Sequence, residues 1–121
     1  MIIGIGTDIV KISRIQQFIG RKDGTPVDMI LTSKESLSKK SVHSIAGSFA
    51  VKEALLKALG IGFSRGLGRL LEIEVLNDDE GKPYVVTSGI INEIRYQKQI
   101  SCIQVSISHD TDYAIAFVIC Q

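Results

Sequence analysis

The chain lacks the features that mark membrane, secreted and nucleic-acid-binding proteins. No apolar run reaches the roughly 20 residues that span a bilayer. The apolar start meets Asp8 at once and has no basic segment in front of it, so it does not fit a signal peptide. The formal net charge of +1 gives no overall attraction to nucleic acids or membranes. We therefore expect a cytoplasmic protein with no nucleic-acid or membrane partner.

Two kinds of local site are also missing. Cys102 and Cys120 lack metal-ligand spacing and fall in apparent strands, so we expect buried free thiols. Four glycines in the stretch 60–68 form a loop that carries Arg65 and Arg69, yet the Gly-Lys-Ser/Thr ending of a phosphate-binding loop is absent. We expect this loop to be mobile and able to fold over an anion.

The remaining sequence predicts one α+β domain over residues 1–121. Its 45% hydrophobic content is enough for one core and is compatible with a surface hidden by self-association. Apolar and alternating stretches predict strands at 2–10, 71–76, 84–87, 102–108 and 113–120, the last four forming two hairpins. Helical spacing predicts helices at 11–19, from a capping box at Thr32 and Glu35 to about 39, from 42–44 to 60, and at 88–99. The elements indicate a largely antiparallel sheet packed on a long central helix.

The central helix carries an acid–base pair. Glu53 and Lys57 lie one turn apart on a stripe with Ala46, Ala50 and Gly60, beside an apolar stripe that includes Phe49 and Leu56. Because these neighbours are small, another part of the molecule can approach the pair closely. Considered alone, the pair also fits a surface ion pair worth about 0.3–0.5 kcal/mol.

The first strand offers a second acidic group. Period two places Gly4, Gly6 and Asp8 on one face, and two glycines in a strand indicate close approach of another backbone. Asp8 then projects beside this bare strip, although a turn or cap aspartate explains it equally well. In the helix that follows, Arg14 and Arg21 share one polar stripe, which is most simply a solvated face.

Four segments follow one another along the chain: IGIGTDIV (3–10), FAVKEA (49–54) with KALG (57–60), EVLN (74–77) with GKPY (81–84), and VSISH (105–109) with YAIA (113–116). In this order they resemble the holo-acyl-carrier-protein synthases, a family of 4′-phosphopantetheinyl transferases. The resemblance implies the fold of that family and Mg²⁺-dependent transfer of 4′-phosphopantetheine from coenzyme A to a serine of apo acyl carrier protein. It further implies a role in fatty acid biosynthesis and a homotrimer with sites between subunits.

The resemblance also implies roles for individual residues. Asp8 and Glu53 are expected to bind Mg²⁺, and Glu53, Lys57 and His109 to take part in catalysis. Coenzyme A is expected to contact Lys57, Gly60, Ser108 and His109. Arg14 and Arg21 are expected to bind the acyl carrier protein, because the family's docking surface lies on the first helix.

The sequence leaves three alternatives open. The general base is either Glu53, acting through a metal-bound water, or the His109–Asp110 pair. Many relatives carry a basic residue at the position of Ser48, and that basic residue helps to hold the 3′-phosphate of the coenzyme. In this chain His43, Lys39, Lys40 and Arg65 are the candidates to replace it, and the sequence does not choose among them. A catalytically silent carrier-binding module is the alternative function, and a purely structural trimer is a third possibility. The joint presence of the polar residues Asp8, Glu53, Lys57 and His109 argues against both.

Overall fold

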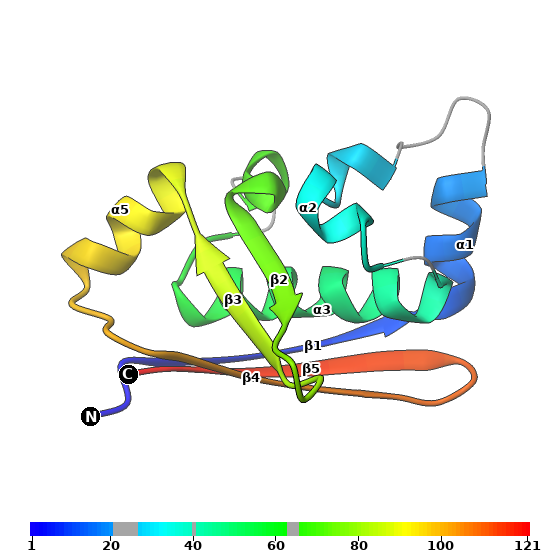
Figure 1. Ribbon diagram of the computed structural model, residues 1–121. Helices are drawn as coiled ribbons and strands as arrows, with labels where there is room; N and C mark the ends of the chain where they lie inside the picture. The colour runs from blue at the N-terminus through cyan, green and yellow to red at the C-terminus, as the bar shows by residue number, and fades with distance from the viewer. Residues whose placement is uncertain (21–26, 40, 63–65) are drawn as a thin grey trace.

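A computed structural model describes residues 1–20, 27–39, 41–62 and 66–121 of the chain. Its main sheet has three strands, β1 (Gly4–Lys11), β4 (Ile103–His109) and β5 (Tyr113–Cys120), in the order β1-β5-β4. Both pairings are antiparallel, so β5 is the central strand (Figure 1). The register places Asp8 opposite Ala116 and His109 opposite Ala114, with their side chains on the face of the sheet that packs on the long helix.

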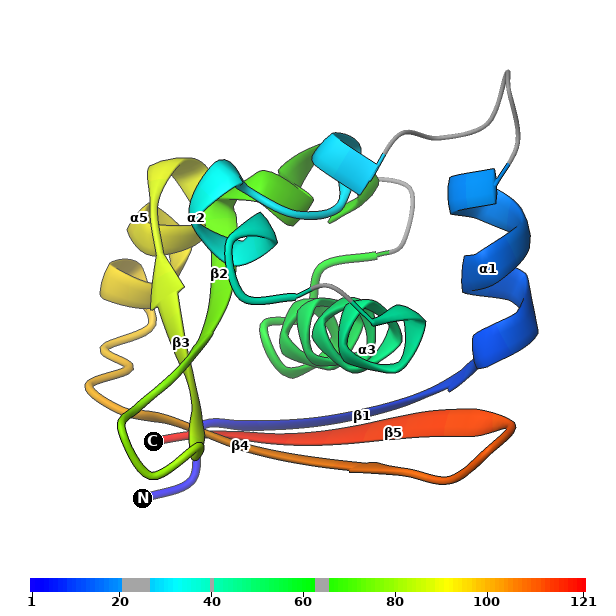
Figure 2. The same ribbon diagram turned by 45° about the vertical axis from the view of Figure 1, so that its right-hand side comes forward.

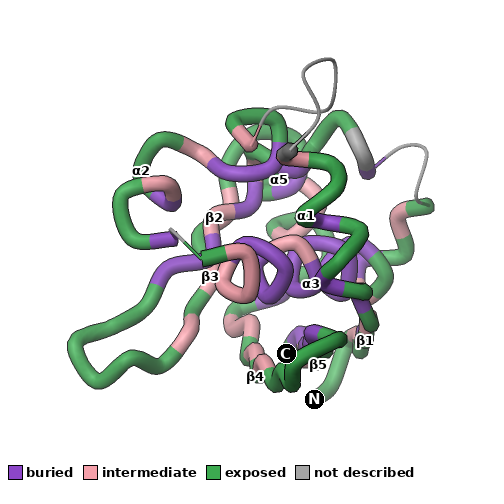
Figure 3. The backbone as a smooth tube through the Cα atoms, turned by 90° about the vertical axis from the view of Figure 1, so that its right-hand side faces the viewer, coloured by how far each residue is buried: buried purple, intermediate pink, exposed green. Residues whose placement is uncertain are grey.

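The long helix, α3 (Val42–Ala58), lies across one face of this sheet (Figure 2). The Ser41 side chain caps its start by accepting from the amide of Ser44 at 3.1 Å. Past its end, Gly60 has φ of +75°, a left-handed conformation that glycine adopts without strain. Burial extends well beyond the expected apolar stripe, because a second layer covers the side of α3 that faces away from the sheet (Figure 3).

That second layer begins with a two-stranded hairpin, β2 (Ile73–Asn77) and β3 (Pro83–Thr87), which forms a separate sheet. The expected strand start at residue 71 is wrong, because Leu67–Glu72 forms a 3₁₀ helix, η2. This 3₁₀ helix also takes up part of the loop that was expected to be mobile. Its last residue, Glu72, accepts with Oε1 from the amides of Ile90 and Ile91 and so caps α5 (Gly89–Gln97).

The layer is completed by two short elements. A single 3₁₀ turn, η1 (Val27–Met29), precedes α2 (Ser33–Ser36). The capping box is confirmed, since Thr32 Oγ1 accepts from the amide of Glu35 and Glu35 Oε1 accepts from the amide of Thr32. The helix ends at Ser36, earlier than expected.

The first helix, α1 (Ile12–Gly20), follows β1 directly and packs against α3 beside the second layer (Figure 2). Ile12 and Ile15 are buried and Arg14 is exposed, as the periodicity predicts. Arg21, which was expected to extend the polar stripe, lies outside the described residues.

The outer face of the main sheet is uncovered and largely apolar. Because α3 covers the other face, alternate residues of β1 and β5 stay exposed; these are Ile5, Ile9, Tyr113, Ile115 and Phe117. Both cysteines are free, and Cys120 is buried while Cys102 is partly exposed. None of the helices in the described ranges combines the length and the apolarity that a bilayer span requires.

Candidate active site

Two glycines set the distance between β1 and α3. A Cβ atom on Gly6 would overlap the carbonyl oxygen of Ala54, and one on Gly4 would overlap that of Ala58. The close approach predicted from the two glycines is therefore confirmed, and the approaching backbone belongs to the helix with the acid–base pair. This contact brings Asp8, at the end of the glycine strip, next to Glu53 and Lys57.

Asp8 and Lys57 form an ion pair across this contact. Lys57 Nζ donates to Asp8 Oδ1 at 3.2 Å and to the carbonyl oxygen of Thr7 at 2.9 Å. The Lys57 side chain is 56% exposed and that of Asp8 only 16%, so the ammonium can still reach a solvent-borne ligand. Burial raises the pKa of the Asp8 carboxyl, and the hydrogen bond and charge of Lys57 oppose this shift.

Glu53 lies deeper in the same cluster. The residue is only 7% exposed, and its Oε1 is buried without a hydrogen-bond partner among the described residues. Burial raises the pKa of the Glu53 carboxyl, the nearby Asp8 carboxylate raises it further, and Lys57 lowers it. A buried carboxylate oxygen without a donor, beside a second carboxylate, is a costly arrangement that a bound cation relieves.

The donor set fits Mg²⁺ better than a metal that needs a full protein cage. No group of three or more His, Cys, Asp or Glu side chains suited to a metal ion occurs in the described part of the chain. Two carboxylates are what Mg²⁺ typically takes from a protein, since its remaining positions go to water and substrate phosphate.

A cavity of about 630 Å³ opens directly from this cluster. Asp8, Glu53 and Lys57 lie along it together with Lys11 and Arg14 of the β1–α1 segment. The rest of its lining is apolar and comes from several elements: Ile9, Val10, Ile15, Phe18, Met29, Ile30, Phe49, Leu56, Ile61 and Leu70. An apolar pocket with a few convergent charged groups is the usual form of a small-molecule site.

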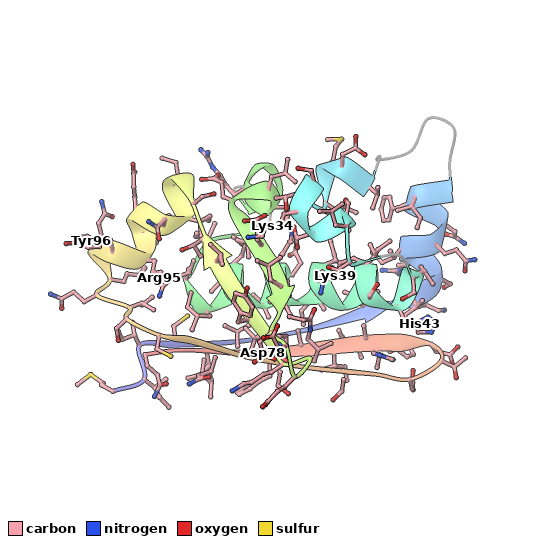
Figure 4. The ribbon with its side chains drawn as sticks, in the orientation of Figure 1. Lys34, Lys39, His43, Asp78, Arg95 and Tyr96 are labelled. Atoms are coloured by element: carbon pink, nitrogen blue, oxygen red, sulfur yellow. The ribbon has the colours of Figure 1, made fainter. Side chains whose placement is uncertain are left out.

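Three of the predicted coenzyme contacts do not line this cavity within one chain. His109 ends β4, with its ring centroid 5.6 Å from that of His43 at the start of α3 (Figure 4). Ser108 pairs with Ile115 and faces the exposed outer side of the sheet. Gly60 follows α3 and is exposed, next to the cavity residue Ile61.

The structure also bears on the choice of general base between Glu53 and the His109–Asp110 pair. Asp110 Oδ1 accepts from the amides of Asp112 and Tyr113, and these backbone donors lower the pKa of the exposed Asp110 carboxyl. Its main role is thus to shape the β4–β5 turn. Of the two candidate bases, Glu53 is the one that lines the cavity.

Ser48, where the family resemblance implied a basic residue, is buried. Ser48 is inaccessible, and its Oγ has no partner in the described ranges. Lys39, one possible substitute, donates to Asn77 Oδ1 at 2.7 Å and is itself nearly buried. His43 is half-exposed, while Lys40 and Arg65 lie outside the described residues.

The fold agrees with what comparisons with known proteins show. The model of the 4′-phosphopantetheinyl transferase superfamily matches residues 4–118. A holo-[acyl-carrier-protein] synthase from Geobacillus sp. is 46% identical, over 98% of this chain and 96% of the relative. The crystal structure of the synthase from Neisseria meningitidis superposes with a TM-score of 0.87 at 33% identity, covering 100% of this chain and 99% of that one. The synthase from Helicobacter pylori, solved with coenzyme A, has a TM-score of 0.80 at 35% identity and covers 97% and 99% of the two chains.

The chain therefore belongs to the 4′-phosphopantetheinyl transferase superfamily. It is an enzyme, a transferase of the holo-acyl-carrier-protein synthase type.

Proposed function

We propose that this enzyme uses Mg²⁺ to transfer 4′-phosphopantetheine from coenzyme A to a serine of apo acyl carrier protein, in the cytoplasm and for fatty acid biosynthesis. The observation that carries the proposal is the buried Oε1 of Glu53, which has no hydrogen-bond partner in the described part of the chain and lies beside Asp8 at the apolar cavity. The names of the relatives and the coenzyme-bound synthase from H. pylori support the choice of substrates.

Asp8 and Glu53 would hold the metal. When bound, Mg²⁺ supplies positive charge that neutralises a pyrophosphate and its leaving group. The serine hydroxyl of the carrier protein gives its proton to the general base, for which Glu53 or the His109–Asp110 pair is the candidate, and its oxygen forms a bond to the β-phosphorus. The bond from that phosphorus to 3′,5′-ADP breaks, and 3′,5′-ADP leaves with the electron pair of that bond. Lys57 can swing from Asp8 to a phosphoryl oxygen, because its flexible ammonium acts as a point charge.

Arg14 is the proposed contact for the carrier protein, together with Arg21. Arg14 is exposed on α1, lines the cavity and follows Asp8 by six residues. A partner with an acidic surface that bound there would present its serine close to the two carboxylates.

A homotrimer is proposed from the uncovered sheet face. Its exposed apolar residues resemble the core of an interface more than a solvated surface. His109 and Ser108 lie outside the cavity of their own chain, which supports sites completed by a neighbouring subunit. Asp8 and Lys57 come from the same chain, so His109 is the residue to test for a shared site.

Mixing chains tests the shared site. Asp8→Asn and His109→Ala chains, each impaired alone, should regain activity when they are unfolded and refolded together, because some mixed sites then hold both intact residues. Unmixed samples of each variant, treated alike, are the control. A fully active monomer in sedimentation at the assay concentration would contradict the trimer.

Mass spectrometry tests the reaction itself. Incubation of the protein with Mg²⁺, coenzyme A and apo acyl carrier protein should add about 340 Da to the carrier, the mass of the transferred group. A carrier whose acceptor serine is replaced by alanine is the control. Binding of the carrier without any added mass would favour the silent carrier-binding module.

A further inference from the structure

Lys52, next to Glu53 on α3, is a lysine that the sequence patterns did not single out. Its side chain is fully buried in the core. The ammonium uses its three donors on three acceptors: Glu35 Oε1 at 2.7 Å, the carbonyl oxygen of Leu70 at 3.0 Å and the carbonyl oxygen of Ile30. One charged group therefore joins α3 to α2, to the segment after η1 and to η2.

Glu35 extends these connections to the hairpin. Its Oε1 also accepts from the amide of Thr32 at 3.0 Å, and its Oε2 accepts from the amide of Val75 at 3.0 Å. Since Glu35 is as deeply buried as Lys52, the pair is fully enclosed and fully hydrogen-bonded. Such a pair costs desolvation and is often no more stabilising than apolar residues of the same volume. Its stability contribution alone does not explain its presence.

The two carbonyl groups bound by Lys52 belong to residues that line the cavity, Ile30 and Leu70. Ile30 directly follows the 3₁₀ turn η1, and Leu70 lies in the short 3₁₀ helix η2. Such elements have few internal hydrogen bonds and poor hydrogen-bond geometry. Backbone hydrogen bonds within these segments therefore do little to fix the distance of Ile30 and Leu70 from α3, so a contact from α3 itself is needed.

We propose that Lys52 is a positioning residue for the transfer reaction, whose ammonium holds the Ile30 and Leu70 wall at a fixed place relative to Glu53 on the same helix. The inference rests on the proposed function, because it assigns this wall to the binding of the transferred group. It explains why a cation is used here, since an ammonium can bind two carbonyl oxygens and a carboxylate at once, which an apolar side chain cannot.

The test removes both charges together. Lys52→Met combined with Glu35→Gln leaves no unpaired buried charge and keeps an amide oxygen that can accept from Thr32 or Val75. We expect this double variant to fold, but to lose about 10²-fold in kcat/KM for coenzyme A, because small misplacements of reacting groups have effects of that order. Glu35→Gln alone keeps the ammonium and its two carbonyl contacts, and should retain most of the activity at a lower melting temperature.

Arg95→Met is the matched control. Arg95 of α5 also donates to two backbone carbonyl groups, of Ile100 at 3.2 Å and of Ser101 at 3.0 Å, but it does not line the cavity (Figure 4). It should lower the melting temperature without changing kcat/KM. If it lowers kcat/KM as much as the double variant, or if the double variant is as active as the wild type, the proposal is wrong.

Hydrogen exchange supplies a readout that does not depend on activity. The amide of Leu31, bonded to Val27, and that of Ile73, bonded to Leu70, should lose protection in the double variant. The amide of Leu59, the residue that follows α3 and is bonded to Leu55, should keep its protection. Unchanged protection at Leu31 and Ile73 would overturn the proposal.

If the wild type shows no transfer at all, the proposed function fails, whereas the hydrogen-exchange measurement still decides whether Lys52 holds the Ile30 and Leu70 wall. If the double variant does not fold, Lys52→Gln in the Glu35→Gln background takes its place.

Discussion

The ammonium of Lys57 donates to two groups of β1, the Asp8 carboxylate and the carbonyl oxygen of Thr7, while the neighbouring Glu53 keeps one buried oxygen for which the described residues offer no partner. The two carboxylates of the site therefore start from different situations. The charge of Asp8 is balanced by the exposed Lys57 ammonium, which a phosphate can attract away. Among the described residues Glu53 Oε1 has no such partner, so a bound metal ion would stabilise the Glu53 carboxylate more than that of Asp8.

Removal of either carboxylate should weaken metal binding and turnover together. Glu53→Gln and Asp8→Asn keep the shape of the site but remove one charge from it. We expect Mg²⁺ affinity and kcat to fall by about 10²-fold or more. Calorimetric Mg²⁺ titration, alongside turnover at limiting Mg²⁺, checks both quantities. A near wild-type rate in limiting Mg²⁺ would show that the replaced residue is not a ligand.

The contribution of Asp8 and Glu53 to the stability of the metal-free protein should fall as pH rises. Burial raises the pKa of Asp8 and Glu53 above their ordinary values of 3.8 and 4.5, so the folded chain keeps protons that the unfolded chain has already lost. The free energy of unfolding contributed by this pair therefore decreases as pH rises from the ordinary values through the raised ones. Added Mg²⁺, which binds the deprotonated groups, should reverse the loss at neutral pH.

Urea unfolding between pH 4 and pH 7, with chelator and with Mg²⁺, measures this dependence. Glu53→Gln is the informative variant, because it removes the more deeply buried titrating group and should flatten the decrease. An identical pH dependence in wild type and variant would show that Glu53 titrates alike in the folded and unfolded chains.

Gly6→Ala should be damaging although it adds a single methyl group. The new Cβ would overlap the carbonyl oxygen of Ala54, so β1 and α3 must move apart. We expect a loss of about 1–3 kcal/mol in stability and a larger relative loss of Mg²⁺ affinity, because Asp8 and Glu53 sit on opposite sides of this contact. Gly68→Ala is the control, since a Cβ there meets open space. Equal melting temperatures for the two variants would contradict this account.

Arg14→Glu should chiefly raise KM for the acyl carrier protein and leave KM for coenzyme A unchanged. The contact is charged and lies at an exposed rim, so its contribution should shrink as salt rises above physiological strength. Steady-state kinetics at two salt concentrations measures both effects. Lys98→Glu, an equal charge change just after α5, is the control. If Arg14 lies on a merely solvated face, neither constant changes.

Much of the fold follows from periodicity and capping, because these patterns are local. Both hairpins and the capping box at Thr32 are present as predicted, except that β2 begins at Ile73 and not at residue 71. The 3₁₀ helix η2 was missed, because glycines at positions 66 and 68 resemble a loop and its order depends on contacts with α5 and Lys52.

The candidate site divides in the same way. Gly4, Gly6 and Asp8 on one strand face indicated a close contact, but the identity of the approaching backbone is a tertiary fact. The burial of Lys52 could not be predicted from the sequence, since a lysine in a helix is normally exposed to solvent. Its acceptors lie 17 to 22 residues away in the chain, and two of them are backbone carbonyl groups that no sequence pattern marks.

The central position of β5 has a consequence for how the chain is made. β1 and β4 each pair with β5 and not with one another, so the main sheet lacks its central strand until residues 113–120 have left the ribosome. Until then β1 is an unpaired strand more than 100 positions away from its partner, as Thr7 Oγ1 and the carbonyl oxygen of Ala116, 109 residues apart, illustrate. Contacts this distant form slowly. A nascent chain thus carries Asp8, Glu53 and Lys57 through synthesis without the sheet that aligns them, and can assemble the proposed metal site only after translation of β5.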